Sequence, residues 1–360
     1  MAIGISPILN WARNNARIEK SYVREIIAEF LATFTLCLFA VGGTMNINAS
    51  INSVGSPIRF VSSPTSSVWP VAFGYFLATL LFGGVSGSHV NPAISIGMAI
   101  AGRLSWVKLH AFILVQILGG YLGSLFAYAM FKSYFDSLTT GDWTNNPASA
   151  AIFNSTPGYI SLGSGFFNEI VLTCLFMMAF LAVNDMWNSR SPRYVQGILI
   201  GLVVIGLGLS FGDTTGVAIN PARDICPRLA ALSLGWDSNI VMKSPSPRDE
   251  QWWSVGFFAP FIGAIVGSFL YIFVIGAQLR YNDGEDSGDV VTIEASPMGM
   301  GMGMGGVEPQ ERWKANVFVP RVPFGKKQQG QPQMPPQMSY QQHPNQMPVM
   351  TPYSRVQFRQ

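Results

Sequence analysis

The sequence contains few charged residues and few cysteines for its length. Charged residues make up 11% of its 360 residues, whereas a soluble globular domain carries about a quarter. The three cysteines, Cys37, Cys174 and Cys226, form no Cys-x-x-Cys or Cys/His cluster, so we expect neither a disulfide framework nor a structural zinc site. The basic residues form no stripe interleaved with aromatic residues, and nucleic acid is therefore excluded as an expected partner.

The sequence also lacks the residue patterns that enzymes use. It contains no glycine-rich nucleotide-binding loop, no metal-ligand cluster and no pairing of a nucleophile with a base. We therefore expect no catalytic activity, no cofactor and no bound metal.

Apolar residues make up 49% of the chain and gather in long runs. A membrane-spanning helix needs about 20 mostly apolar residues. Six segments meet this requirement: 23–44, 69–86, 106–131, 164–184, 194–212 and 252–277. Two shorter apolar segments, 92–102 and 221–232, cannot cross a bilayer alone, and each begins at an Asn-Pro-Ala motif.

The two halves of the chain resemble each other. Residues 28–33 read Ala-Glu-Phe-Leu-Ala-Thr, and residues 168–173 read Asn-Glu-Ile-Val-Leu-Thr. Residues 87–95 and 216–224 both carry a glycine followed at the same spacing by Asn-Pro-Ala. Because each half has three spanning segments, the second half enters the membrane from the opposite side. We therefore predict an all-α membrane protein with six transmembrane helices and two re-entrant half-helices in an inverted repeat.

Basic residues predict the orientation in the membrane. They lie before span one, between spans two and three, and between spans four and five: Arg13, Arg17, Lys20, Arg24, Arg103, Lys108, Arg190 and Arg193. By the positive-inside rule this side is cytoplasmic, and six spans place both termini there. We expect a cytoplasmic N-terminal segment (1–21), a membrane domain (22–278) and a cytoplasmic tail (279–360). The tail is rich in Gly, Met, Gln and Pro and is expected to be disordered.

The expected location is the plasma membrane, because the sequence shows no retention motif. Asn48 and Asn154 begin glycosylation motifs on the predicted outer side. Trp252 and Trp253 begin the sixth span and are expected in the interfacial aromatic belt. Glycines within the spans suit close helix packing in lipid; they include Gly119, Gly120, Gly123, Gly197, Gly201, Gly263 and Gly267.

The two Asn-Pro-Ala motifs predict where the half-helices begin. Proline suits the first helical turn, and the preceding Asn91 or Asn220 is a strong N-cap. Two such helices entering from opposite faces would meet at their N-termini, whose positive dipole ends disfavour cations. The two asparagine amides could then donate hydrogen bonds to neutral solutes. A third copy, Asn146-Pro147-Ala148, lies in a polar outer loop and is expected to form a plain turn.

This pattern resembles the major intrinsic proteins, the family of aquaporins and aquaglyceroporins, over residues 22–278. The resemblance implies a passive channel domain there, assembled as a homotetramer with one pore per subunit. It places both motifs in the pore: Asn91, Pro92, Ala93, Asn220, Pro221 and Ala222. It also implies that four residues brace the loops that carry the half-helices: Glu29, His89, Gln116 and Glu169.

The resemblance further places a selectivity filter at Val71, Gly208, Val217 and Arg223. Arg223 would hold a solute hydroxyl and repel cations. Water-selective members have histidine at the position of Gly208, so glycine is expected to leave the filter open. Bacterial glycerol-passing members stack two aromatic residues where this chain has Val71 and Val217, although Trp69 is near the first of these. Three residues match the glycerol branch of the family: Asp224, Arg228 and Pro260.

The resemblance thus implies a channel for glycerol, water and other small neutral solutes, with urea and hydrogen peroxide as further permeants, that excludes ions and protons. One alternative is a water-dominant channel with little solute flux. Another is an ion-coupled secondary transporter, since such proteins also use broken helices; only Glu29 and Glu169 could then bind the coupling ion. A last alternative is a scaffolding membrane protein with a closed pore, in which the tail is the active part.

Overall fold

The computed structural model of the chain describes residues 7–52, 64–137, 143–145, 147–155, 160–243, 251–279, 290–295 and 313–318. The chain divides into two units, Met1–Tyr281 and Asn282–Gln360.

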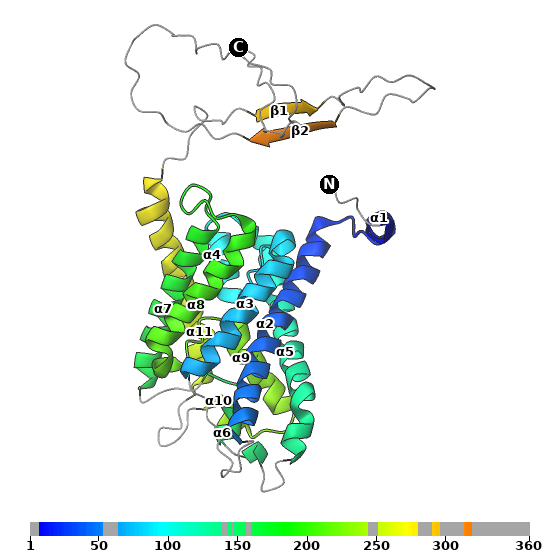
Figure 1. The fold of residues 1–360 in the computed structure, drawn as a ribbon. Coiled ribbons are helices and arrows are strands. Elements are labelled where there is room, and N and C mark those ends of the chain that lie inside the picture. The colour runs from blue at the N-terminus through cyan, green and yellow to red at the C-terminus, as the bar shows by residue number, and fades with distance from the viewer. Residues whose placement is uncertain are drawn as a thin grey trace, which may run out of the picture. The chain divides into compact units, whose positions relative to one another are not determined.

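The first unit is a bundle of long helices (Figure 1). A short helix, α1 (Pro7–Asn15), precedes it. The first half of the bundle contains α2 (Ser21–Asn52), α3 (Pro64–Ser86), α4 (Pro92–Ile100) and α5 (Trp106–Ser137). The second half contains α7 (Leu162–Val183), α8 (Arg193–Thr215), α9 (Pro221–Ser233) and α11 (Trp253–Leu270). The last helix continues as a π-helical turn (Tyr271–Ile275) and a 3-10 turn (Gly276–Gln278).

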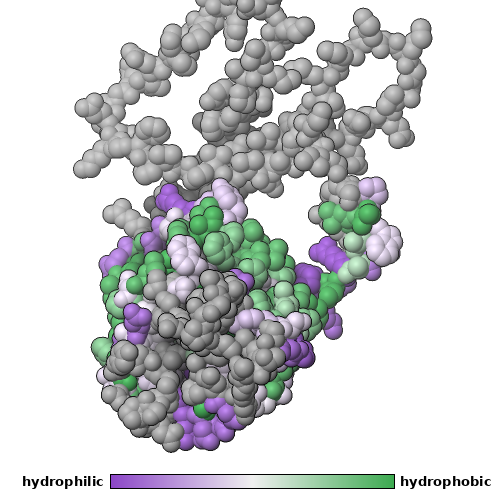
Figure 2. All heavy atoms as spheres, turned by 60° about the horizontal axis from the view of Figure 1, so that its bottom comes forward, coloured by the Kyte–Doolittle hydropathy of each residue, from purple (hydrophilic) through white to green (hydrophobic). Residues whose placement is uncertain are grey.

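Six of these helices are long and apolar enough to cross a membrane: α2, α3, α5, α7, α8 and α11 with its continuation. Their positions agree with the six spans predicted from the sequence, and the two short helices α4 and α9 begin where the Asn-Pro-Ala motifs predict. Large apolar side chains such as Leu114, Met130 and Phe167 are exposed on this unit, and the face drawn in Figure 2 carries areas of hydrophobic residues with hydrophilic residues among them. A surface of this kind is suited to lipid.

The two halves pack in equivalent ways. In the first half α2 packs against α3 and α5, and in the second half α7 packs against α8 and α11. Each short helix packs mainly on the last long helix of the other half, α4 on α11 and α9 on α5. The two halves are therefore packed together through the two half-helices.

Glycines bring these helices close together at equivalent places. On α5, a Cβ atom at Gly119 or Gly123 would overlap a backbone oxygen of α2. On α11, a Cβ atom at Gly263 or Gly267 would lie 2.5 Å from a backbone oxygen of α7. Both pairs are spaced by four residues, so they line one helix face and allow backbone-to-backbone packing.

Two structural expectations are corrected. The Trp252 side chain does not face the membrane as a belt residue would, because it is buried against α7, where a Cβ atom at Gly165 would meet the indole ring. The third Asn-Pro-Ala copy does not form a plain turn. Pro147 begins the one-turn helix α6 (Pro147–Ala150), which follows a 3-10 turn (Trp143–Asn145); Asn146 lies outside the described residues. A second short helix, α10 (Ser238–Met242), follows α9.

The second unit contains two strands, β1 (Val290–Ala295) and β2 (Trp313–Phe318). They pair antiparallel, with Val290 opposite Phe318 and Ala295 opposite Trp313. We expected no regular structure in this tail from its composition. The two strands coincide with its segments richest in β-branched and aromatic residues, which favour extended backbone. The rest of the tail lies outside the described residues.

Candidate functional site

Both half-helices begin at an asparagine with extended backbone. Asn91 has φ −156° and ψ 118°, and its side-chain oxygen accepts a hydrogen bond from the Ala93 N–H at 2.9 Å. Asn220 has φ −148° and ψ 110°, and its oxygen accepts from the N–H groups of Ala222 and Arg223 at 3.0 and 3.2 Å. Proline occupies the first helical turn in both cases. Local chemistry therefore fixes where each half-helix starts.

The two caps also bind each other's loops. The Asn91 Nδ2 atom donates to the Ile219 carbonyl at 2.9 Å, and the Asn220 Nδ2 atom donates to the Val90 carbonyl at 2.8 Å. Each acceptor is the residue directly before the other motif. The positive N-terminal ends of α4 and α9 therefore meet inside the bundle.

The loops before the motifs share a strained backbone. Ser88 and Val90 have φ of 50° and 49°, and the equivalent Val217 and Ile219 have φ of 49° and 42°. This left-handed region is unfavourable for β-branched residues, at a cost of about 1–3 kcal/mol each. Surrounding groups must therefore hold both loops in place.

A buried glutamate from each half holds one loop. Glu29 on α2 accepts from the Val90 N–H and from the Gln116 Nε2 atom, the latter at 2.9 Å. Glu169 on α7 accepts from the N–H groups of Ala218 and Ile219, both at 2.8 Å. The Thr215 hydroxyl also donates to Glu169.

His89 and Gln116 extend this network in the first half. The His89 Nδ1 atom lies 3.2 Å from the Ser95 hydroxyl, and the Gln116 Nε2 atom donates to the same hydroxyl at 2.9 Å. The His89 ring packs edge to face with the rings of Phe112 and Phe180. The structure thus places all four residues that the resemblance assigned to loop support around the two motif loops.

Arg223 lies on the first turn of α9 and is half-buried. Its Nη1 atom donates to the carbonyls of Val217 at 2.8 Å and Ala218 at 3.4 Å. Within the described part of the chain it forms no ion pair with a carboxylate. A partly buried guanidinium without a counter-ion is tolerated in a membrane protein where it faces water or a polar solute.

The other expected filter positions are apolar and buried. Val71 and Val217 are 5% and 6% exposed. A Cβ atom at Gly208 would overlap the side chain of Val68, which comes from α3. Gly208 therefore does not leave the opening expected from the sequence, because Val68 occupies that space. Trp69 is 48% exposed and lies two residues from Val71, on the opposite face of the helix.

Two residues that the resemblance associates with the glycerol branch form a buried connection between α9 and neighbouring segments. Arg228 and Asp224 make a fully buried ion pair, with Nε 2.9 Å from Oδ2. Arg228 also donates to the carbonyls of Ser155 and Val241, and Asp224 accepts from the Ser155 N–H and hydroxyl. The pair thus joins α9 to α10 and to the segment around Ser155. Pro260 is buried in the middle of α11.

Sequence reasoning missed two residues at this site. Val68 fills the space beside Gly208, and the Tyr75 hydroxyl accepts a hydrogen bond from Asn220 at 2.8 Å. The available signal was spacing, because Val68, Val71 and Tyr75 follow each other at three and four residues and so lie on one face of α3.

Comparisons with known proteins agree with this arrangement. The model of the family described as "Major intrinsic protein" matches residues 17–271. Human aquaporin-10 is 32% identical over 282 residues, which cover 77% of this chain and 89% of that protein. The aquaglycerol porin AQY3 of Saccharomyces cerevisiae is 32% identical over 252 residues, covering 69% of this chain and 37% of that protein. The X-ray structure of the aquaglyceroporin from Plasmodium falciparum aligns with a TM-score of 0.61 at 26% identity, covering 71% of this chain and 97% of that chain.

Proposed function

The chain belongs to the major intrinsic protein family, and from this premise we propose that it is a passive channel for glycerol, other small neutral solutes and water. It is a multi-pass membrane protein of a non-enzymatic family. The observation that carries the proposal is the meeting of Asn91 and Asn220 at the N-termini of two half-helices. Amide donors and positive dipole ends at one point favour neutral hydrogen-bonding solutes over cations.

The residues around Arg223 support passage of a solute with one polar and one apolar side. Its guanidinium offers hydrogen-bond donors, whereas Val71 and Val217 offer an apolar surface. Glycerol has hydroxyls along one edge and a carbon skeleton along the other, and it fits such a lining. Urea and hydrogen peroxide are proposed as further permeants because both are small, neutral and hydrogen-bonding. The positive charge of Arg223 disfavours cations and hydronium.

Two relatives strengthen the glycerol assignment. One is named as an aquaglycerol porin, and the aligned structure is that of an aquaglyceroporin. The Asp224–Arg228 pair, which the resemblance associates with the glycerol branch, is retained here as a buried connection.

A water-dominant channel is the second candidate, and one observation favours it. Val68 fills the space beside Gly208, so the filter is narrower than the sequence suggests. An ion-coupled transporter is less well supported. Both carboxylate oxygens of Glu169 accept hydrogen bonds from the loop, and Oε1 of Glu29 accepts from the Val90 N–H, so only Glu29 Oε2 is without a partner among the described residues.

Residues 22–278 form the proposed channel domain, with 1–21 and 279–360 on the cytoplasmic side of the plasma membrane. The basic residues of the connections support this orientation by the positive-inside rule. We further propose a homotetramer with one pore per subunit, which chemical cross-linking in native membranes would test.

Stopped-flow light scattering on proteoliposomes tests the function. The expected result is glycerol and water permeability well above that of empty liposomes, linear in glycerol concentration and independent of ion gradients. Water flux without glycerol flux would favour the second candidate. Saturable glycerol flux that requires an ion gradient would contradict a channel of either kind.

A further inference from the structure

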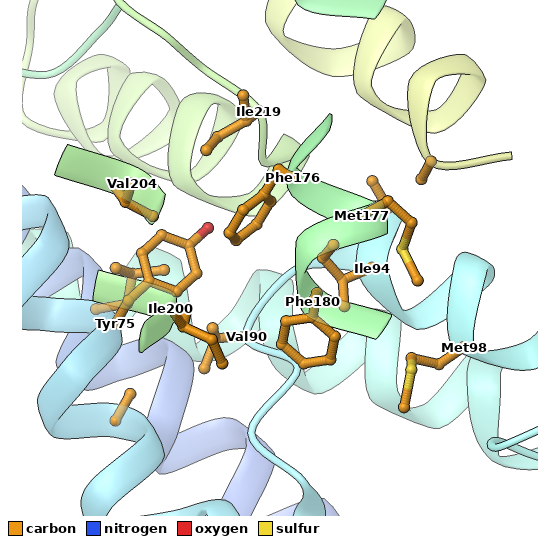
Figure 3. Packing of buried hydrophobic residues seen from close by; sticks show 14 of the residues in the cluster. Tyr75, Val90, Ile94, Met98, Phe176, Met177, Phe180, Ile200, Val204 and Ile219 are labelled. Atoms are coloured by element: carbon orange, nitrogen blue, oxygen red, sulfur yellow. The ribbon is translucent and has the colours of Figure 1, made fainter. Parts of the chain in front are cut away.

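An aromatic side chain lies where the two motifs meet. Tyr75 on α3 is one helical turn beyond Val71, and Val204 on α8 is one turn before Gly208. Figure 3 shows the Tyr75 ring next to Phe176 of α7, with Val204 and Ile219 close by. These side chains therefore surround the path that leads from the expected filter to the motif asparagines.

The Tyr75 hydroxyl accepts the second of the two hydrogen bonds that the Asn220 amide can donate. A primary amide has two N–H hydrogens. One is donated to the Val90 carbonyl and the other to the Tyr75 hydroxyl, both at 2.8 Å. Asn220 therefore has no hydrogen left for a passing solute. A permeant oxygen that bound to this amide would have to replace the tyrosine oxygen.

The rings close the space around this bond. Tyr75 and Phe176 contact each other edge to face, with ring centroids 5.5 Å apart and planes at 70°, which is the usual geometry of packed aromatic pairs. Tyr75 and Asn220 are 0% exposed, and Phe176 and Ile219 are 1% exposed. Side chains that line an open, water-filled path would remain accessible to water, so no water molecule fits here.

We propose that Tyr75 is a gate at the centre of the pore. This proposal rests on the channel function proposed above. In the closed state, which the structure shows, the hydroxyl occupies Asn220 and the ring closes the path against Phe176. Conduction requires the ring to move off Asn220. A permeant that carries a hydroxyl or water oxygen then accepts the freed amide hydrogen, which offsets the lost bond. A solute without an acceptor cannot do so and is disfavoured.

A purely structural tyrosine would behave in the opposite way. Its removal would weaken packing and lower the flux, whereas removal of a gate raises it. The direction of the change in permeability therefore separates the two roles.

The test compares single-channel water and glycerol permeabilities of wild type, Tyr75→Val and Phe176→Leu in proteoliposomes, normalised to the amount of reconstituted protein. We expect both variants to raise both permeabilities by about tenfold, the factor that corresponds to about 1.4 kcal/mol. Phe176→Leu shortens the side chain that packs against Tyr75. It provides an independent measurement of the gate if Tyr75→Val does not fold. Tyr121→Val is the matched control. Tyr121 also makes a side-chain hydrogen bond, to Ser233 at 2.9 Å, but away from the motifs, so its loss should leave both permeabilities unchanged.

Each outcome decides the matter. High permeability of wild type with no increase in either variant overturns the gate and leaves the channel function standing. Increased water flux without glycerol flux supports the gate and contradicts the glycerol preference. Folded variants that pass neither water nor glycerol overturn both proposals.

Discussion

Asn91 and Asn220 each donate a hydrogen bond to the carbonyl that precedes the other's motif. Each residue therefore has two roles: its oxygen caps its own half-helix, and its amide binds the opposite loop. The centre of the protein is held together by the same two side chains that the channel function requires.

The first prediction concerns this exchange. Asn91→Ala or Asn220→Ala removes a helix cap and leaves a buried carbonyl without its partner, so each should destabilise the fold by about 1–3 kcal/mol. Thermal unfolding in detergent would measure the loss. Asn168→Ala is the control, because among the described residues the Asn168 amide donates to the Ser164 carbonyl of its own helix and to no other segment. Equal melting temperatures for Asn220→Ala and Asn168→Ala would argue against the cross-linking role.

The second prediction concerns Gly208 and Val68. Gly208→Ala places a methyl group on the Val68 side chain, and overpacking of this kind costs about 1–3 kcal/mol. Val68→Ala in the same chain should restore the stability. Gly206→Ala is the matched control on the same helix, since a Cβ atom there has no neighbour within 4 Å. If Gly208→Ala is as stable as Gly206→Ala, the space beside Gly208 is open after all.

The same pair bears on solute selection. Val68→Ala alone should raise the ratio of glycerol to water permeability, because it removes the side chain that fills the space beside Gly208. Stopped-flow measurements of both permeabilities would show this. An unchanged ratio would mean that Val68 packs against α8 without limiting the filter.

The third prediction concerns Glu169. Glu169→Gln replaces one acceptor oxygen by an NH2 group, which donates hydrogen bonds and cannot accept one from a loop N–H, so one buried donor loses its partner. The expected cost is about 1–3 kcal/mol, with reduced water and glycerol permeability as the second loop loosens. The remaining flux should still be independent of ion gradients. If the wild type instead shows ion-coupled flux, and Glu169→Gln abolishes the coupling without changing stability, the protein is a transporter.

The fourth prediction concerns the buried ion pair. Arg228→Met leaves Asp224 buried without its partner, and such a change costs about 3–5 kcal/mol. The double variant Asp224→Asn/Arg228→Met removes both charges and should recover part of that loss. The free energies of unfolding of the wild type, Arg228→Met, Asp224→Asn and the double variant form a double-mutant cycle. Additive effects would show that the two residues do not stabilise each other.

Local patterns determined the elements of this protein. Apolar runs of about 20 residues defined the six spans, and Asn-Pro fixed the starts of α4 and α9, because capping and proline geometry act within a few residues. The internal repeat and the motif spacing also identified the family, which the comparisons confirmed.

Contacts between distant segments were decided only by the tertiary structure. Val68 beside Gly208, Tyr75 on Asn220 and the burial of Trp252 each join helices far apart in the chain. No single-sequence pattern encodes such pairs, because helix rotation and side-chain packing set them once all the helices are in place. The sequence thus determined that two half-helices meet at the two asparagines, whereas packing determined that a tyrosine occupies their meeting point.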